Sequence, residues 1–318
     1  MQASLGSTDL KVSPIGLGLA ALGRPGYITL GHGSDLAGHT DERSLERTTH
    51  AVLDTAYACG VRYFDAARSY GKAEAFLGSW LANRGLGPDD VTVGSKWGYT
   101  YTAGWQISAA VPEVKDLSIA TLLRQYPESR SLLGTTLRLY QIHSATLDSG
   151  VLDDPAMLDE LARLRATGLA IGITVTGPGQ GETVERALET GAFDAVQATW
   201  NLLEPSAGPA LAAAHDAGIG VIIKEALANG RLSARGATGE VTEWAQRAGT
   251  TPDALALAAA LSQPWADVVL SGAATPGELQ SNLAALTLKL PIELLNELDQ
   301  LRQEPIDYWS TRAQLPWN

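Results

Sequence analysis

Eight short apolar segments alternate with helical segments along most of the chain, and this alternation limits the possible folds more than any other sequence feature. The apolar segments have the length of buried strands and lie at residues 14–19, 61–65, 91–96, 137–143, 169–174, 193–198, 219–224 and 267–272. Strands that alternate with helices form a parallel sheet with right-handed connections. Eight such units predict an α/β protein whose sheet closes into a (β/α)8 TIM barrel.

The segments between these strands carry helix signals. Residues 46–60 place apolar side chains at helical spacing and end on Gly60, a residue type that is common at helix C-termini. Residues 153–168 begin with Asp and Pro and end on Gly168. The same plan returns in two further segments, 205–218 and 275–286.

Both ends of the chain predict additions to the barrel. Turn residues in the segment 5–13 indicate an N-terminal β-hairpin that closes the barrel floor. Residues 291–304 predict one more helix, and the tail beyond them ends in "DYWSTRAQLPWN", whose aromatic residues imply that it packs onto the barrel. No linker or low-complexity run interrupts the chain, so we expect one barrel domain over residues 1–318.

A dinucleotide-binding turn of the doubly wound type is a rival interpretation. Residues 16–21, "GLGLAA", fit the pattern G-x-G-x-x-G/A, and Asp35 follows roughly twenty residues later. That motif must open a helix, whereas Pro25 and Gly26 follow here and prevent one. The barrel is therefore the favoured fold.

The charge balance and the single cysteine restrict the class of protein. The net charge is −12, which argues against general nucleic-acid binding. No apolar run reaches membrane-spanning length, and the first residues lack the charged and apolar regions of a signal peptide. Cys59 is the only cysteine, which fits a reducing cytoplasm. We expect a cytoplasmic protein without nucleic-acid or membrane partners; its oligomeric state stays open.

Polar residues stand where the predicted strands end, which is where barrels of this class carry out chemistry. These residues are Asp65, Lys96, His143, Thr174, Gln197, Lys224 and Glu225, and Tyr70 follows Asp65 by five positions. We expect Asp65 to pair with Lys96, and the Lys96 ammonium to lower the pKa of Tyr70. His143 can donate a hydrogen bond to a substrate oxygen. Together these residues outline a proton-transfer site.

Two further groups have competing interpretations. His32, Asp35, His39 and Asp41 lack recognised metal-ligand spacing, so we expect solvated or pocket-rim residues and no metal. An aromatic-rich loop follows Lys96, and we expect Trp97 and Tyr99 to contact the substrate. Ordinary burial of that loop is the alternative.

The chain resembles the aldo-keto reductase family. Residues 60–74, "GVRYFDAARSYGKAE", are similar to the segment that carries the family's Asp and Tyr. "VTVGSKWG" and "LYQIHSA" resemble the segments with its Lys and His, and the likeness continues through "VQATWN" and "SGAATPGELQSN". The resemblance implies a catalytic tetrad in which Tyr70 is the general acid for hydride transfer to a small carbonyl or from an alcohol. The other members are Asp65, Lys96 and His143.

The resemblance also implies a nicotinamide cofactor, NADP by family habit with NAD possible. It places Gln197 and Thr174 at the carboxamide and Lys224 at the position that stacks on nicotinamide. Residues 226–232, "ALANGRL", are similar to the pyrophosphate loop, with Leu227 and Gly230 as contacts. Asn282 matches the adenine-contacting position, and Thr275 and Glu278 face the 2′-phosphate. No cation adjoins Glu278 in sequence; a cation such as Arg24 or Arg231 could reach the phosphate from elsewhere in the fold, or backbone N–H groups at the start of the last helix could bind it.

Two other functions stay open at this point. A cofactor-holding regulatory or sensor subunit could use the same scaffold with little turnover, and the replacements at Lys224, Glu225 and Val175 support this alternative. A barrel isomerase could use Tyr70 and Lys96 as acid and base without net redox chemistry. The intact set of four residues favours the reductase.

Overall fold

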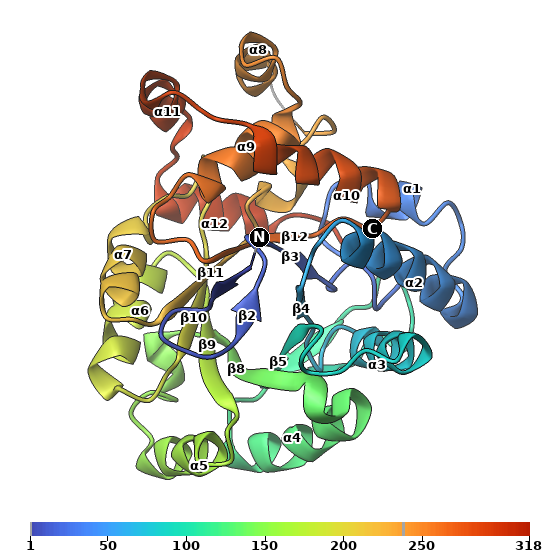
Figure 1. Ribbon diagram of the computed structural model, residues 1–318, viewed down its shortest axis with the longest axis vertical. Helices are drawn as coiled ribbons and strands as arrows, with labels where there is room; N and C mark the ends of the chain where they lie inside the picture. Colours follow the sequence, from blue (N-terminus) through green and yellow to red (C-terminus); the bar gives the residue numbers. More distant parts are fainter. Residues whose placement is uncertain (1, 237–238) are drawn as a thin grey trace.

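The strands form a closed parallel barrel, which confirms the predicted (β/α)8 fold (Figure 1). A computed structural model describes residues 2–236 and 239–318. Around the barrel, each strand pairs with the next along the chain and the last pairs with the first. In chain order the strands are β3 (Ile15–Gly18), β4 (Tyr63–Asp65), β5 (Thr92–Trp97), β8 (Leu137–Ala145), β9 (Ala170–Val175), β10 (Ala195–Thr199), β11 (Gly220–Lys224) and β12 (Val268–Ser271).

Helices surround the barrel and bury their apolar faces against it (Figure 1). The surrounding helices are α2 (Glu42–Ala58), α3 (Ala73–Arg84), α4 (Ile119–Leu133), α5 (Pro155–Arg165), α6 (Gln180–Thr190), α7 (Gly208–Asp216), α9 (Pro252–Leu261) and α10 (Pro276–Leu283). Smaller elements are α1 (His32–Asp35), α8 (Gly239–Arg247), α11 (Ile292–Leu298) and the 3-10 turns η1 (Gly134–Thr136), η2 (Leu147–Ser149), η3 (Ala228–Gly230), η4 (Ala284–Thr287) and η5 (Asp299–Leu301). Side-chain caps fix several of the helix starts, as at Asp154, which accepts from the first-turn amides of α5.

The predicted N-terminal hairpin is present. Strands β1 (Ala3–Ser4) and β2 (Lys11–Val12) pair antiparallel and lie across the end of the barrel that faces the viewer in Figure 1. Leu5, Leu10 and Val12 are buried with inward side chains of the barrel strands, among them Tyr63 and Leu139. The hairpin thus closes the floor with apolar contacts, and this leaves the opposite end for chemistry.

The C-terminal tail contains a helix that the sequence analysis did not anticipate. Helix α12 (Pro305–Ala313) follows the predicted helix, which is shorter than expected and is represented by α11 and η5. Pro305 occupies the first turn, where a missing amide hydrogen costs nothing. Tyr308 and Trp309 are buried in a cluster with side chains of α8, α9 and α11. The expected packing of the tail aromatics is therefore present, although the tail is more regular than predicted.

A second unpredicted element covers the catalytic end. Strands β6 (Tyr99–Tyr101) and β7 (Glu113–Lys115) form an antiparallel pair beyond the end of β5. This hairpin brings Tyr99 and Glu113 into the wall of the main cavity.

Turns and not a helix follow β3 directly. This is expected for the barrel and not for a dinucleotide-binding turn.

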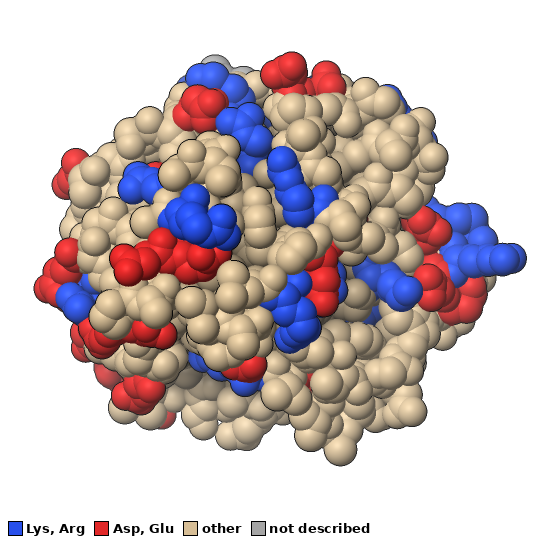
Figure 2. Space-filling model, turned by 90° about the horizontal axis from the view of Figure 1, so that it is seen from below, with Lys and Arg blue, Asp and Glu red and all other residues tan. Residues whose placement is uncertain are grey.

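The surface carries charged side chains of both signs. Acidic and basic side chains lie next to one another across the face seen in Figure 2. Within the described ranges, no helix combines the length and the apolar character needed to cross a membrane.

Candidate active site

A buried ion pair lies at the centre of the catalytic end. Asp65 ends β4 and Lys96 lies near the end of β5, and their side chains are only 2% and 1% exposed. The Lys96 ammonium donates to Asp65 and, at 2.9 Å, to the carbonyl of Ala66. Burying either charge alone would be costly, so the pairing explains why a carboxylate can follow an apolar strand.

Neutral donors complete the coordination of the Asp65 carboxylate. Its Oδ1 atom accepts hydrogen bonds from the Tyr63 hydroxyl at 3.1 Å, Gln141 Nε2 at 3.2 Å and Gln197 Nε2 at 3.3 Å. These side chains come from β4, β8 and β10. The pair is therefore built from several strands of the barrel and is rigidly held.

Tyr70 lies in the loop after β4 and faces this pair. Lys96 Nζ is 4.8 Å from the centroid of the Tyr70 ring, and the His143 ring centroid is 5.5 Å away. Gly71 follows at a φ of +58°, and a Cβ there would lie 2.4 Å from the carbonyl oxygen of Gly23. Only glycine fits this left-handed, crowded position. The turn that presents Tyr70 thus depends on Gly71.

The pKa of Tyr70 is shifted in the direction opposite to the one expected from the sequence. Burial raises the pKa of the Tyr70 phenol well above its ordinary value, and the Asp65 charge raises it further. Lys96 is held directly against Asp65, so the carboxylate offsets part of the field of the ammonium at Tyr70. Arg24 is the cation that lowers the pKa of Tyr70.

His143 is buried at 8% exposure and contacts the rings of Tyr70 and Tyr99. Burial holds its pKa well below the usual histidine value, and the charges of Lys96, Lys224, Arg24 and Lys115 lower it further. The imidazole is therefore neutral near pH 7 and keeps one N–H to donate.

One cavity of about 680 Å³ collects most of the predicted site residues. It is lined by Asp65, Tyr70, Tyr99, His143, Thr174, Gln197, Lys224, Leu227, Gly230, Glu278 and Asn282. Lys96 lies behind Asp65 and does not line the cavity. Thr275 is also absent from the wall, because its hydroxyl caps α10 by accepting from the Glu278 amide at 3.2 Å.

The structure does not support a substrate contact by Trp97. Its side chain is fully buried in the hydrophobic core between the barrel and the helices. Successive side chains of a strand point to opposite faces, so Trp97 points away from the interior that Lys96 occupies. Tyr99, two residues beyond, does line the cavity.

Lys224 and Glu225 both contact the Thr199 hydroxyl, and Glu225 also pairs with the C-terminal tail. Lys224 Nζ donates to the Thr199 hydroxyl at 2.9 Å, and burial lowers the pKa of the Lys224 ammonium to about 8. Glu225 adopts a φ of +55° and turns towards the tail, where its carboxylate accepts two bonds from Arg312 of α12, the Nε contact being 2.8 Å. The acidic residue after β11 therefore fastens the tail helix to the barrel.

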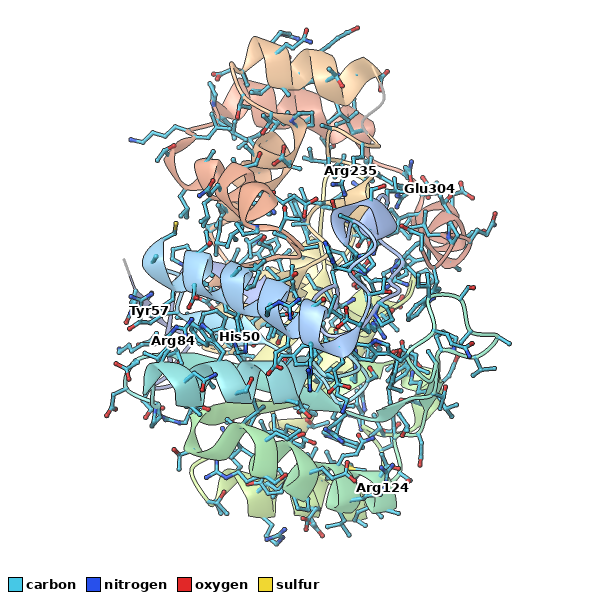
Figure 3. All side chains as sticks on the ribbon, turned by 90° about the vertical axis from the view of Figure 1, so that its right-hand side faces the viewer. His50, Tyr57, Arg84, Arg124, Arg235 and Glu304 are labelled. Carbon is cyan, nitrogen blue, oxygen red and sulfur yellow. The ribbon has the colours of Figure 1, made fainter. Side chains whose placement is uncertain are left out.

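The cation near Glu278 is Arg235, not Arg24 or Arg231. Arg235 lies beside α1 in Figure 3, where it pairs with Asp35 and reaches Glu278 at 3.0 Å. Arg231 instead lies over the Tyr308 ring, 4.4 Å from its centroid. Two carboxylates share one guanidinium at this end of the cavity.

A model described as "Aldo/keto reductase family" matches residues 14–303 of the sequence.

The chain belongs to the aldo/keto reductase family.

Known proteins of the family cover nearly the whole chain. An "NADH-specific methylglyoxal reductase" of Escherichia coli (strain K12) is 26% identical, over 90% of this chain and 93% of the relative. An uncharacterized oxidoreductase of Bacillus subtilis (strain 168) is 25% identical, over 95% of each. The holo form of an aldo-keto reductase from Bacillus halodurans shares the fold, with a TM-score of 0.74, 21% identity and coverage of 95% and 96%.

The cavity of this aldo/keto reductase fits the nicotinamide cofactors that the family uses. Its volume suits a large organic ligand. His32 and Asn229 line it, and within residues 2–236 and 239–318 neither nitrogen of His32 nor Oδ1 of Asn229 has a hydrogen-bond partner. At Gly272 and Gly277 a Cβ would meet no atom within 4 Å, so the wall there is open. A long polar ligand would satisfy these groups. In the same ranges, no cluster of three His, Cys, Asp or Glu residues could hold a metal ion.

Sequence reasoning missed several charged groups of the site. Glu113, Arg235 and Arg312 all line the cavity, as does Trp317 of the tail; Arg24 also lines it, although the sequence suggested it only as a cation for the 2′-phosphate. None of them ends a barrel strand, so the rule that located the other residues could not find them. No local sequence signal marks their partners, which lie far away along the chain.

Replacing Glu225 with Gln should lower the melting temperature at neutral pH, because Arg312 would lose its partner. Burial alone would raise the pKa of Glu225, but the charges of Arg312 and Lys224 and hydrogen bonds from Arg312 and Thr199 lower it from 4.5 to about 2. A carboxyl with a depressed folded-state pKa stabilises the fold above its unfolded pKa, and this contribution disappears as pH falls towards the folded value. Melting temperatures of both proteins should therefore converge between about pH 4.5 and 2. A difference that stays constant down to pH 2 would contradict the pairing.

Proposed function

We propose that this aldo/keto reductase transfers hydride between a nicotinamide cofactor and a small carbonyl or alcohol, with Tyr70 as the general acid. The observation that carries the proposal is the buried Asp65–Lys96 pair with Tyr70 and His143 at one end of the cavity. The cofactor supplies the hydride. Tyr70 supplies the proton that the carbonyl oxygen needs, and this general-acid step typically contributes 10²–10⁴-fold.

Each neighbour of Tyr70 has a distinct part in the proposal. The phenol is protonated at neutral pH, because its pKa is raised, so it can donate. Neutral His143 donates its N–H to the same substrate oxygen and orients it. Lys96, fixed by Asp65, stays within 4.8 Å of the Tyr70 ring as the phenolate forms. Together these groups stabilise negative charge that develops only in the transition state.

A regulatory or sensor role is the second candidate, and Lys224 is the observation that favours it. The resemblance expects an aromatic ring at this position, whereas here an ammonium lines the cavity. Deuterium tracing separates the two functions: the pure protein is given NADH deuterated at C4 and a panel of small aldehydes and ketones. Deuterium in the product alcohol supports the reductase. Cofactor binding by nicotinamide fluorescence without label transfer would support the sensor.

We further infer that NADH is preferred to NADPH. Asp35 and Glu278 both contact Arg235, so the single cation at this end of the described cavity wall is already paired twice over. A 2′-phosphate would meet two carboxylates, whereas the hydroxyls of NADH can donate to them. The NADH-specific relative supports this inference. It replaces the NADP preference expected from family habit.

The double variant Asp35→Asn/Glu278→Gln should shift cofactor preference towards NADPH. Wild type is expected to favour NADH by about ten- to a hundredfold in kcat/KM, or roughly 1.4–2.8 kcal/mol. Removing both negative charges frees Arg235 for the phosphate, so the ratio should fall by at least about tenfold. Arg235→Met in the double variant is the control and should remove the gain. A wild type that prefers NADPH, or an unchanged ratio in the variant, would contradict the assignment.

A further inference from the structure

Arg24 is a buried arginine beside Tyr70, the proposed general acid. It is not one of the catalytic set Asp65, Tyr70, Lys96 and His143. It follows β3 and is only 2% exposed. Its Nη1 atom donates to the carbonyl of Ser69 at 3.1 Å and to Glu113 at 3.0 Å, and Nε donates to the carbonyl of Ala20 at 3.3 Å. Ser69 immediately precedes Tyr70, so one guanidinium bond fixes the backbone that carries the acid.

The guanidinium of Arg24 also stacks among aromatic rings. Its Cζ atom is 5.2 Å from the centroid of Tyr70, 5.0 Å from that of Tyr27 and 4.6 Å from that of Trp317. These distances lie within the range of cation–π contacts. The flat guanidinium suits such a setting better than an ammonium would.

The backbones of the two segments are in direct contact. A Cβ on Gly23 would lie 2.1 Å from the carbonyl oxygen of Tyr70, and the amide of Lys72 donates to the carbonyl of Gly23 at 2.7 Å. The Arg24 segment and the Tyr70 loop are therefore packed backbone against backbone. Arg24 contacts both the main chain next to Tyr70, at the Ser69 carbonyl, and the Tyr70 ring.

Two cations face Tyr70, and their counterions differ. The partner of Lys96 is Asp65, which is as deeply buried as the lysine and lies directly against it. The partner of Arg24 is Glu113, whose side chain is 24% exposed and thus partly screened by water. The field of Arg24 at Tyr70 is consequently less cancelled than that of Lys96.

We propose that Arg24 is a positioning residue for Tyr70: it fixes the Ser69–Tyr70 backbone and stabilises the phenolate that remains after proton transfer. The inference rests on the proposed function. In carbonyl reduction the O–H bond of Tyr70 breaks, its proton goes to the substrate oxygen, and the electron pair stays on the phenolate oxygen. Solvent then returns a proton to Tyr70.

Other charged and titratable groups also surround Tyr70, and they define the background for a pH experiment. Asp65 of β4, Glu113 of β7 and Glu225 after β11 raise the pKa of the phenol. Lys96 of β5 and His143 of β8 adjoin the ring, and Tyr27 lies on the far side of Arg24. Arg24 lowers that pKa, so its removal should leave the acidic groups unopposed.

Arg24→Met should lower kcat for alcohol oxidation at neutral pH by at least about tenfold, and move the Tyr70 limb of the pH–rate profile to higher pH. Arg24→Lys should restore most of the rate and move the limb back, because it restores the charge. A merely structural arginine would lower the melting temperature and leave the limb in place. That outcome would overturn the proposal.

Arg62→Met is the matched control. Arg62 also donates to main-chain carbonyls and lies 4.0 Å from the ring centroid of Tyr57, at the end of α2 that Figure 3 shows away from Arg235. Arg62 therefore makes carbonyl and cation–π contacts like those of Arg24, but none of them involves Tyr70. The control should leave both kcat and the limb unchanged.

A turnover-free measurement separates failure of this inference from failure of the proposed function. A fluorinated tyrosine, whose phenol is more acidic, is placed at position 70 and its ¹⁹F shift is followed against pH. The phenol should titrate at higher pH in the Arg24→Met background than with arginine present. An unchanged midpoint would overturn the inference about Arg24, whatever the enzyme's activity. A wild type without hydride transfer but with the shifted midpoint would overturn only the proposed reaction.

Discussion

Tyr70→Phe should lower kcat for carbonyl reduction by about 10²–10⁴-fold and leave cofactor affinity close to that of wild type. The substitution removes one oxygen and keeps the ring that packs against His143 and Arg24. Binding of the substrate and the cofactor should therefore persist, while the proton donor is lost. Steady-state kinetics with a small aldehyde, together with a fluorescence titration of the reduced cofactor, measure the two quantities separately.

The matched control is Tyr57→Phe, which removes a hydroxyl from α2 at the labelled position in Figure 3. This tyrosine is not part of the cavity wall. Its variant should retain wild-type kcat. A Tyr70→Phe protein that turns over aldehydes within a few-fold of wild type would mean that another group donates the proton. A comparable loss in both variants would point to a general effect on folding.

The strands and three of the four central residues could be predicted because one physical rule governs both, whereas the role of Tyr70, in the loop after β4, came from the family resemblance. Parallel strands in a closed barrel are buried on both faces, so they read as apolar runs that stop at polar residues. Where such a run stops marks the catalytic end of the barrel. Asp65, Lys96 and His143 all follow this rule, and the structure brings them to one cavity end.

The residues that the sequence analysis misplaced or missed are those whose spatial neighbours cannot be inferred from their position along the chain. Trp97 was expected at the substrate because it follows Lys96, yet the two-residue period of a strand turns it to the core. Arg24, Arg235 and Arg312 come from loops and the tail, and their partners lie 89, 200 and 87 positions away. Pairing over such separations depends on the folded barrel and leaves no local pattern.

The same limit applies to acidity. The proximity of Lys96 to Tyr70 was predictable, but its effect on the Tyr70 pKa was not, because that depends on how closely Asp65 cancels the ammonium. Burial then becomes the largest influence on the phenol. The electrostatics of the site are thus set by ion-pair contacts that only the three-dimensional arrangement defines.

The Asp65–Lys96 pair sets the largest expected effect on stability, since both side chains are almost fully buried. Lys96→Met leaves the Asp65 carboxylate in the barrel with only neutral donors among the described residues, from Tyr63, Gln141 and Gln197. An uncompensated buried charge of this kind costs about 3–5 kcal/mol. The exposed pair Arg84–Asp54, with side chains 42% and 44% exposed, provides the control. Arg84→Met should leave the free energy of unfolding close to that of wild type, because exposed ion pairs contribute little.

Urea unfolding of Lys96→Met, Arg84→Met and the double variant Asp65→Asn/Lys96→Met tests the physical cause as well as the magnitude. If the penalty comes from the unpaired carboxylate, neutralising Asp65 as well should recover part of the lost free energy, because the remaining amide is cheaper to bury. Activity should not recover, since the ammonium 4.8 Å from the Tyr70 ring is absent from both Lys96 variants. Stability that falls further in the double variant would mean that Asp65 and Lys96 contribute independently. In that case the ion pair would not be what holds the catalytic end of the barrel together.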